Sequence, residues 1–446
     1  MTTPDEDRRA LAALGVVPAE ILLPAPGIDL FKWAVIACDQ YTTDVEYWQK
    51  VAWVVGEAPS SLHLVLPEVY LGAADEEERI ARIHRTMRDY LRRGILRPVG
   101  TGLVYLERRT AFGRLRRGVL AAVDLERYDY RPGARPPIRA TEATVVDRLP
   151  PRVRIRRGAV LEVPHAMLLL DDRRRRTIEP LVALGQTKRP LYETSLMMGG
   201  GEIRGFMLNE AEALSVLRNG LEALAASGGE DSFLLAVGDG NHSLAAAKVV
   251  WEERKTAGAP ITHPARYTLV EIINLYDEGL VLGPIHRAVH GMGGEELLRA
   301  LETFFAGRGS GVEIRYVRDR GEAGVIRLQL AEERPGAQFF EFISGEVGGV
   351  VSITSPPHLL TVGTLQMFLD ELEAQGRVRV DYIHGEEAVA ALARRPGWVG
   401  FFLPAMAKEE LFPTVRKHGM LPKKSFSLGE AEEKRFYLEC RRIAEV

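Results

Sequence analysis

The chain has 446 residues, more than one ordinary hydrophobic core accommodates, so we expect two or more lobes. Its 58 basic and 61 acidic side chains give a net charge of −3, which leaves no general basic excess for binding nucleic acid. The two cysteines, Cys38 and Cys440, are too few and too far apart for a disulfide framework or a structural zinc site.

The first residues are charged and lack the apolar core of a signal peptide. The sequence also has no apolar run of about 18 residues, the length that a membrane-spanning helix needs. We therefore expect a cytoplasmic protein that does not bind a membrane.

Apolar periodicity predicts alternating elements in the first half of the chain. Predicted helices are 6–14, 45–55, 75–93, 209–226 and 244–254. Predicted strands are 33–38, 62–66, 103–107, 117–124, 160–170, a part of 181–191, and 233–237. The glycine-rich segment 195–201 is expected to be flexible.

The second half continues the alternation. Helices are predicted at 295–305 and 365–375, and strands at 267–275, 313–317, 339–343 and 398–403. This order favours a mixed α/β fold. The loop at 257–264 suggests a lobe boundary, with an N-terminal lobe at 1–258 and a C-terminal α/β lobe at 259–446.

The strongest local signal follows the apolar strand 233–237. There the chain reads Gly238-Asp239-Gly240-Asn241-His242-Ser243 and then continues as a helix. Glycines allow a tight turn and close approach of a ligand, and a helix N-terminus attracts phosphate. Asp239 could accept a proton or hold a metal ion, and His242 could donate to phosphate or act as an acid or base.

The same turn has a purely structural interpretation, in which Asn241 or Ser243 caps the helix. The chain contains neither a P-loop sequence nor a Rossmann glycine fingerprint, because Ser243 stands where the last glycine of that fingerprint would be. From these residues alone, a phosphate site and a capped helix both remain open.

Other polar residues follow predicted strands or loops. The candidates are Glu142 with Asp147 and Arg148, Asp39 with Gln40, His286 with Arg287, and Lys423 with Lys424. Arginine suits bidentate binding of phosphate, and carboxylates suit base or metal roles. Each group also has an ordinary alternative, namely a solvated loop, a turn, or, for His286, a hydrogen-bonded core histidine.

Four of these segments occur in an order that resembles a large prokaryotic family known only as domain of unknown function ten-fifteen. Its hallmark, Ala-Asp-Gly-His-His-Arg after a buried strand, is similar to Val237–Ser243. Its other landmarks resemble Glu142–Arg148, Gly283–Arg287 and Met420–Phe426. The similarity extends over nearly the whole chain.

The resemblance implies a nucleotide-binding core like that of free-serine kinases and, more remotely, of the ParB and sulfiredoxin group, with a second α/β lobe added. It implies ATP or ADP with Mg²⁺ as cofactors and phosphoryl transfer to free L-serine or a similar hydroxyl metabolite. Asp239, His242 and Glu142 would be catalytic, and Asp239 would also be the Mg²⁺ ligand. The phosphate-binding residues would be Gly238, Gly240, Asn241, Ser243, Arg148, His286, Arg287, Lys423 and Lys424.

The hallmark is altered here, since Asn241 replaces its first histidine and Ser243 its arginine. Losing a guanidinium removes a charge-assisted phosphate contact, so we expect Arg148, Arg287, Lys423 or Lys424 to replace it. The alternative function is a nucleotide-binding regulatory protein without turnover, as in ParB-like switches. A sulfiredoxin-like reductase lacks support, because neither cysteine lies in the turn.

Overall fold

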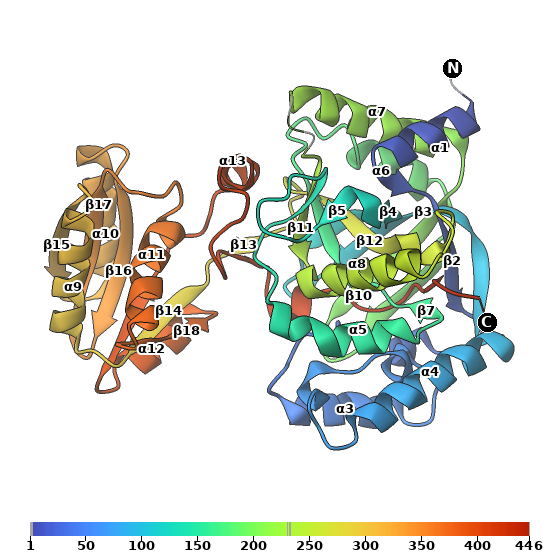
Figure 1. The fold of residues 1–446 in the computed structure, drawn as a ribbon, viewed down its shortest axis with the longest axis horizontal. Coiled ribbons are helices and arrows are strands. Elements are labelled where there is room, and N and C mark those ends of the chain that lie inside the picture. The colour runs from blue at the N-terminus through green and yellow to red at the C-terminus, as the bar shows by residue number, and fades with distance from the viewer. Residues whose placement is uncertain (1–2, 230, 232, 446) are drawn as a thin grey trace. The chain divides into compact units, whose positions relative to one another are not determined.

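The computed structural model describes residues 3–229, 231 and 233–445. The chain forms two compact units (Figure 1). The first unit contains residues 1–281 together with 428–446, and the second contains residues 282–427. The boundary expected at residue 258 differs from this division, because the strand that follows it belongs to the large sheet of the first unit.

The first unit is built around an eleven-stranded mixed sheet. Its strand order is β5 (Tyr128–Asp129), β6 (Ile138–Ala140), β11 (Leu235–Asp239), β8 (Met167–Leu170), β12 (Tyr267–Asn274), β4 (Leu115–Asp124), β3 (Leu96–Arg109), β10 (Gly201–Leu208) and β9 (Tyr192–Leu196). Two further strands, β1 (Val16–Val17) and β2 (Ala19–Pro24), pair with β4 and β3. The predicted mixed α/β class is confirmed, whereas the ParB-like core stays a prediction.

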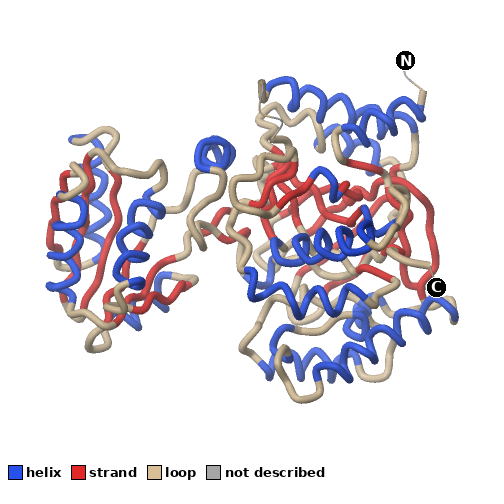
Figure 2. The backbone as a smooth tube through the Cα atoms, viewed as in Figure 1, coloured by secondary structure: helices blue, strands red, loops and turns tan. Residues whose placement is uncertain are grey.

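Alternation along the strands divides the core of this unit between two faces. In β3, Leu103 and Tyr105 join one cluster, which also contains apolar residues of α1 (Pro4–Ala13), α6 (Glu179–Gln186), α7 (Ala211–Ser227) and α8 (Asn241–Thr256). Val104 and Leu106 join the other, with residues of α3 (Val45–Val55) and α4 (Glu76–Arg92). Figure 2 shows the strands of the first unit between helices.

The end of the chain belongs to this first core. Residues 428–445, which we call the C-terminal strap, form isolated bridges from Phe436 to Ile36 and from Cys440 to Leu22. Further on, β21 (Arg441–Arg442) pairs with β7 (Leu161–Glu162). The strap thus connects N-terminal segments to the neighbourhood of the central sheet.

The second unit has a six-stranded antiparallel sheet. Its order is β15 (Gly311–Val317), β17 (Val347–Thr354), β16 (Gln338–Ser344), β19 (Trp398–Phe402), β14 (His286–His290) and β18 (Arg379–Ile383). Its helices are α9 (Gly294–Ala306), α10 (Arg320–Glu333), α11 (Thr361–Ala374), α12 (Glu386–Ala393) and α13 (Lys408–His418).

Several predicted elements differ from the structure. The strand predicted at 33–38 is the end of the short helix α2 (Leu30–Trp33) followed by a single bridge residue, and 62–66 lies mostly in a 3-10 turn. Helix α6 occupies the start of 181–191, and the segment expected to be flexible, 195–201, connects β9 to β10 in an ordered hairpin. Within the described residues, no helix has both the length and the apolar character needed to cross a membrane.

Candidate functional site

The predicted strand, glycine turn and helix are confirmed as β11, Gly240 and α8. Gly240 has φ +80°, in the left-handed region, and a Cβ there would lie 2.8 Å from the Cα of Ala166. Its N–H donates to Asp239 Oδ1 at 2.8 Å. A glycine is therefore required at 240 both by the backbone conformation and by the close approach of Ala166, the residue before β8.

The N-terminus of α8 has no side-chain cap among the described residues, since Gly240 itself is the N-cap residue. The capping role considered for Asn241 and Ser243 is thus not what the structure shows. Asn241 Oδ1 is buried and has no hydrogen-bond partner within the described part of the chain. The first turn of α8 therefore begins without a side-chain cap from its N-cap residue, and a helix N-terminus of this kind favours an anion.

The segment after β6 lies beside this turn. Strand β6 runs parallel to β11, with Ala140 opposite Val237, so both strands end at the same edge of the sheet. Thr141 Oγ1 donates to the Val237 carbonyl at 2.7 Å, and the Val145 N–H donates to His242 Nε2 at 3.3 Å. The sequence reasoning thus brought together two segments that are almost a hundred residues apart.

The side chains that follow Thr141 are more exposed than Thr141 itself, which is buried. Glu142 is half-buried, whereas Asp147 and Arg148 are exposed. Arg148 precedes helix α5 (Leu149–Arg157), and its carbonyl accepts from Arg152. A role for Glu142 or Arg148 in the site stays a prediction.

A cation that the sequence reasoning missed pairs with Asp239. Lys434, on the C-terminal strap, places Nζ 3.2 Å from Asp239 Oδ2, and its side chain is 10% exposed. Arginines fix the backbone around it: Arg108 donates to the carbonyls of Lys434 and Glu432, and Arg116 to that of Glu433. In the sequence, Lys434 stands in a run of charged residues that is typical of a solvated turn.

Asp39 lies in a second polar group of the first unit. Its Oδ1 accepts from Gln40 Nε2 at 3.0 Å, and its Oδ2 lies 3.4 Å from His165 Nε2. The other ring nitrogen of His165 is 2.9 Å from the hydroxyl of Tyr437, which also contacts the Cys38 N–H and Sγ at 3.0 and 3.1 Å. Sequence reasoning named Asp39 and Gln40 but had no signal for His165 or Tyr437.

The two polar groups are electrostatically linked. Burial by itself would raise the pKa of Asp39, but the charge and hydrogen bond of His165, followed by Gln40 and Lys434, lower it. Burial by itself would lower the pKa of His165, but Asp39 and then Asp239 and Glu68 raise it. His165 also directly precedes Ala166, the residue packed against Gly240.

The remaining predicted residues, His286, Arg287, Lys423 and Lys424, belong to the second unit, where the side chains of the first three have structural partners. Arg287 is fully buried and donates to Gln366 Oε1 and to the carbonyls of Ile285, Lys423 and Lys424. His286 is buried, and burial lowers its pKa to about 4, so its neutral ring accepts from the Leu403 N–H. Lys423 pairs with Asp370 and Glu373 at 3.4 and 3.3 Å.

The predicted Mg²⁺ site finds only partial support in the donor set. No group of three or more histidine, cysteine or acidic side chains in the described chain is placed to hold a metal ion. Asp239 offers one carboxylate, but Lys434 already neutralises it. One carboxylate is enough for Mg²⁺ that arrives coordinated by nucleotide phosphates, and it is too few for a resident ion.

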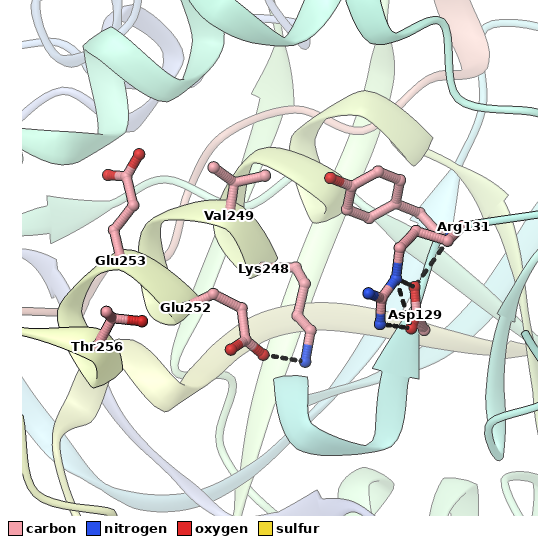
Figure 3. A pocket seen from close by; sticks show the side chains of 8 residues that line it. Asp129, Arg131, Lys248, Val249, Glu252, Glu253 and Thr256 are labelled. Atoms are coloured by element: carbon pink, nitrogen blue, oxygen red, sulfur yellow. Dashed lines mark hydrogen bonds and ion pairs between the residues drawn. The ribbon is translucent and has the colours of Figure 1, made fainter.

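A separate pocket of about 700 Å³ lies along the C-terminal half of α8. Figure 3 shows its side chains: Lys248 pairs with Glu252, and Arg131 with Asp129. Its charged groups thus neutralise one another, and its lining residues differ from those predicted for the site. The predicted site lies instead at the N-terminal end of this helix.

The chain belongs to the family described as "Protein of unknown function (DUF1015)", whose model matches residues 22–371. Comparison with curated proteins found no match. Among solved structures, the chain is similar to a free serine kinase in complex with AMP, at 15% identity over 73% of this chain and 91% of that chain, with a TM-score of 0.37.

Two further solved structures are similar over comparable lengths. A conserved hypothetical protein from Pyrococcus furiosus matches at 14% identity over 72% of this chain and 90% of its own, with a TM-score of 0.34. SbnI with C-terminal truncation from Staphylococcus aureus matches at 10% identity over 70% and 82%, with a TM-score of 0.34.

Proposed function

We propose that this protein is a nucleotide-dependent kinase that transfers a phosphoryl group to a small hydroxyl metabolite, with free L-serine as the first acceptor to test. The observation that carries the proposal is the uncapped N-terminus of α8, which begins at Gly240 beside the buried Lys434 and Asp239 pair. A helix end favours phosphate through its N–H groups and dipole, and the Lys434 ammonium, which has three donors, can contact phosphate while it stays paired with Asp239.

Each part of the turn has a role in this proposal. The N–H groups of Asn241 and Ser243, with Gly238 and Gly240 admitting close approach, would hold phosphate oxygens. His242 Nε2 accepts from the Val145 N–H, so the neutral ring carries its proton on Nδ1, and that nitrogen would donate to phosphate. Mg²⁺ bound to ATP or ADP would neutralise the transferring phosphoryl group beside Asp239.

We assign to Lys434 the role of the cation that replaces the hallmark arginine, whose position is occupied here by Ser243. Four residues were named for that role, and two of them, Arg287 and Lys423, have structural partners in the second unit. Lys434 instead belongs to the same unit as the turn and contacts Asp239 directly. We therefore assign the phosphate-side charge to Lys434.

The test is thermal unfolding of the protein with ATP, ADP or AMP, each with and without Mg²⁺. A nucleotide at a hundred times its Kd stabilises the native state by about 2.7 kcal/mol. Lys434→Ala should weaken binding by about 1.5–3 kcal/mol, roughly ten- to a hundredfold. Lys255→Ala is the matched control, because Lys255 pairs with Glu126 near the far end of α8.

A second function, nucleotide binding without turnover, is favoured by one observation: both oxygens of Asp239 are already held, one by the Gly240 N–H of its own turn and the other by Lys434, so Asp239 cannot exchange a partner for an acceptor hydroxyl without disturbing the turn. In that case nucleotides would stabilise the protein, but no phosphoryl group would reach serine or water. If no nucleotide stabilises the parent protein, both functions are wrong for this chain.

A further inference from the structure

Asp39 and Asp239 both reach solvent, and each is paired with a basic side chain that is more deeply buried. The side chains of Asp39 and Asp239 are 24% and 20% exposed, whereas those of His165 and Lys434 are 9% and 10% exposed. The pairs also influence each other, since Lys434 acts on Asp39 and Asp239 acts on His165. An acceptor bound near the turn would thus meet the carboxylates before the cations.

Hydrogen-bond accounting indicates the charge state of the Asp39 pair. The Tyr437 oxygen accepts from the Cys38 N–H, and its O–H donates to Cys38 Sγ. With the Tyr437 hydroxyl donating to Sγ, the proton between Tyr437 and His165 Nδ1 comes from the ring, because a phenol has only one hydrogen to donate. His165 Nε2 faces a carboxylate, which can only accept. All the partners are therefore satisfied when His165 donates from both nitrogens, as an imidazolium.

We propose that Asp39 is the carboxylate that receives the proton of the acceptor hydroxyl, and that His165 and Tyr437 are positioning residues that hold it. This inference rests on the proposed function and adds the acceptor side of the same site. As the acceptor oxygen forms a bond to the terminal phosphorus of the nucleotide, the bond to the leaving phosphate oxygen breaks. The acceptor's proton passes to Asp39, and the shortened nucleotide leaves with the negative charge.

The partners of the two carboxylates distinguish their roles. Asp239 Oδ1 is held by the N–H of Gly240 within its own turn, and Oδ2 by the phosphate-side cation Lys434. Among the described residues, the hydrogen bond to Asp39 Oδ1 comes from the side-chain amide of Gln40, a half-buried group that can rotate away from a hydroxyl. Asp39 can therefore exchange a partner for the acceptor without disturbing the turn.

The experiment separates nucleotide binding from transfer. Nucleotide affinity is measured by calorimetry, and transfer by single turnover of nucleotide labelled in its terminal phosphate, with L-serine and with water as acceptors. Asp39→Asn should leave affinity within about twofold and slow transfer about 100-fold or more, as expected for loss of a general base. Asp239→Asn should weaken affinity, and Asp129→Asn, at the opposite end of α8, is the matched control for a half-buried, paired aspartate.

The positioning residues have a different expected result. His165→Gln and Tyr437→Phe should lower kcat less than Asp39→Asn does, leave nucleotide affinity unchanged, and move the acidic limb of the kcat profile to higher pH. A merely structural role would not move that limb. If His165→Gln does not fold, as judged by circular dichroism, Tyr437→Phe supplies the measurement.

Transfer within threefold of the parent in Asp39→Asn would overturn the inference and leave the proposed function intact. So would an equal loss of nucleotide affinity in Asp39→Asn and Lys434→Ala, because Asp39 would then belong to the phosphate side. A parent protein that binds nucleotide but transfers to neither acceptor also overturns it, in favour of binding without turnover. A parent that binds no nucleotide refutes the proposed function itself.

Discussion

The two units use similar motif residues for different purposes. In the second unit, His286 and Arg287 are 1% and 0% exposed and bind the backbone or side chains of their own unit. In the first unit, Asp239 at the end of β11 and His242 in the first turn of α8 are half-buried. A histidine or arginine in a family landmark is therefore a candidate ligand only where its side chain remains accessible to a bound molecule.

The largest expected effect tests whether buried charges of the first unit are structural. Arg435 is 1% exposed and pairs with Glu271 at 2.6 Å and with Glu439. Arg435→Met leaves two buried carboxylates short of a cation, so it should lower the free energy of unfolding by about 3–5 kcal/mol. Chemical denaturation of the full-length protein and of the variant measures this difference in the free energy of unfolding.

The control for that variant is Arg157→Met, which breaks an ion pair whose partners are 57% and 42% exposed. A surface pair contributes about 0–1 kcal/mol, so the control should change stability little. Equal effects of the two variants would show that burial does not distinguish them.

The next prediction sharpens the comparison from the second unit. Arg287→Met removes four hydrogen bonds and should destabilise that unit by about 1.5–3 kcal/mol or more, because hydrogen bonds to a charged group are lost. Nucleotide affinity should not change. A loss of affinity with unchanged stability would restore Arg287 to the phosphate-binding residues; Arg377→Met, which breaks an exposed pair with Glu296, is the control.

Sequence patterns predicted elements where one periodicity dominated. Helix α4, with Ile80, Ile83 and Met87 on one face, agrees with its predicted range within a residue or two, as do α3, α7 and β12. The prediction was wrong at 33–38, where an apolar run suggested a strand. The reason is tertiary: Trp33 ends a short helix and donates from Nε1 to the Leu438 carbonyl on the strap.

The candidate site was predictable only in part. The glycine turn and its neighbouring segment could be found because they are continuous in sequence and follow apolar strands. Lys434 and Tyr437 could not, because the strap that carries them lies about two hundred residues further along the chain than Asp239. His165 could not, because its partner Asp39 is distant in the sequence. Their roles depend on contacts that leave no local spacing for a pattern to reveal.

A substitution at Gly240 distinguishes the two reasons for a glycine there, namely its left-handed backbone conformation and the close approach of Ala166. Gly240→Ala should cost about 1–2 kcal/mol for the left-handed backbone, plus a displacement of the turn away from Ala166. Gly258 at the other end of α8 has φ +93° and open space around its missing Cβ, so Gly258→Ala isolates the backbone cost. Only Gly240→Ala should also weaken nucleotide binding, as measured by thermal shift.

The last prediction concerns pH and the pair of Asp39 with His165. The pKa of His165 is raised, so its contribution to stability is complete below about 6.5, the value expected for an unfolded histidine, and is lost as pH rises through the raised value. The pKa of Asp39 is lowered, so its contribution is present above about 3.9 and is lost as pH falls through the lowered value. The pair therefore stabilises the first unit most between about pH 4 and 6.5.

The free energy of unfolding of the parent protein should therefore exceed that of His165→Gln, and the difference should be largest near the middle of that window. Above neutral pH the difference should become smaller. Asp239, Glu68, Lys434 and Tyr437 also face this imidazole and are the same in both proteins. His263→Gln is a control of opposite sign, because burial lowers the pKa of His263, whose Nδ1 accepts from the Ala265 N–H. Its margin should grow as pH rises through 6.5, since the native state then binds fewer protons than the unfolded chain. Parallel slopes for the two variants would contradict an imidazolium at His165 and, with it, the placement of Asp39 that the acceptor side requires.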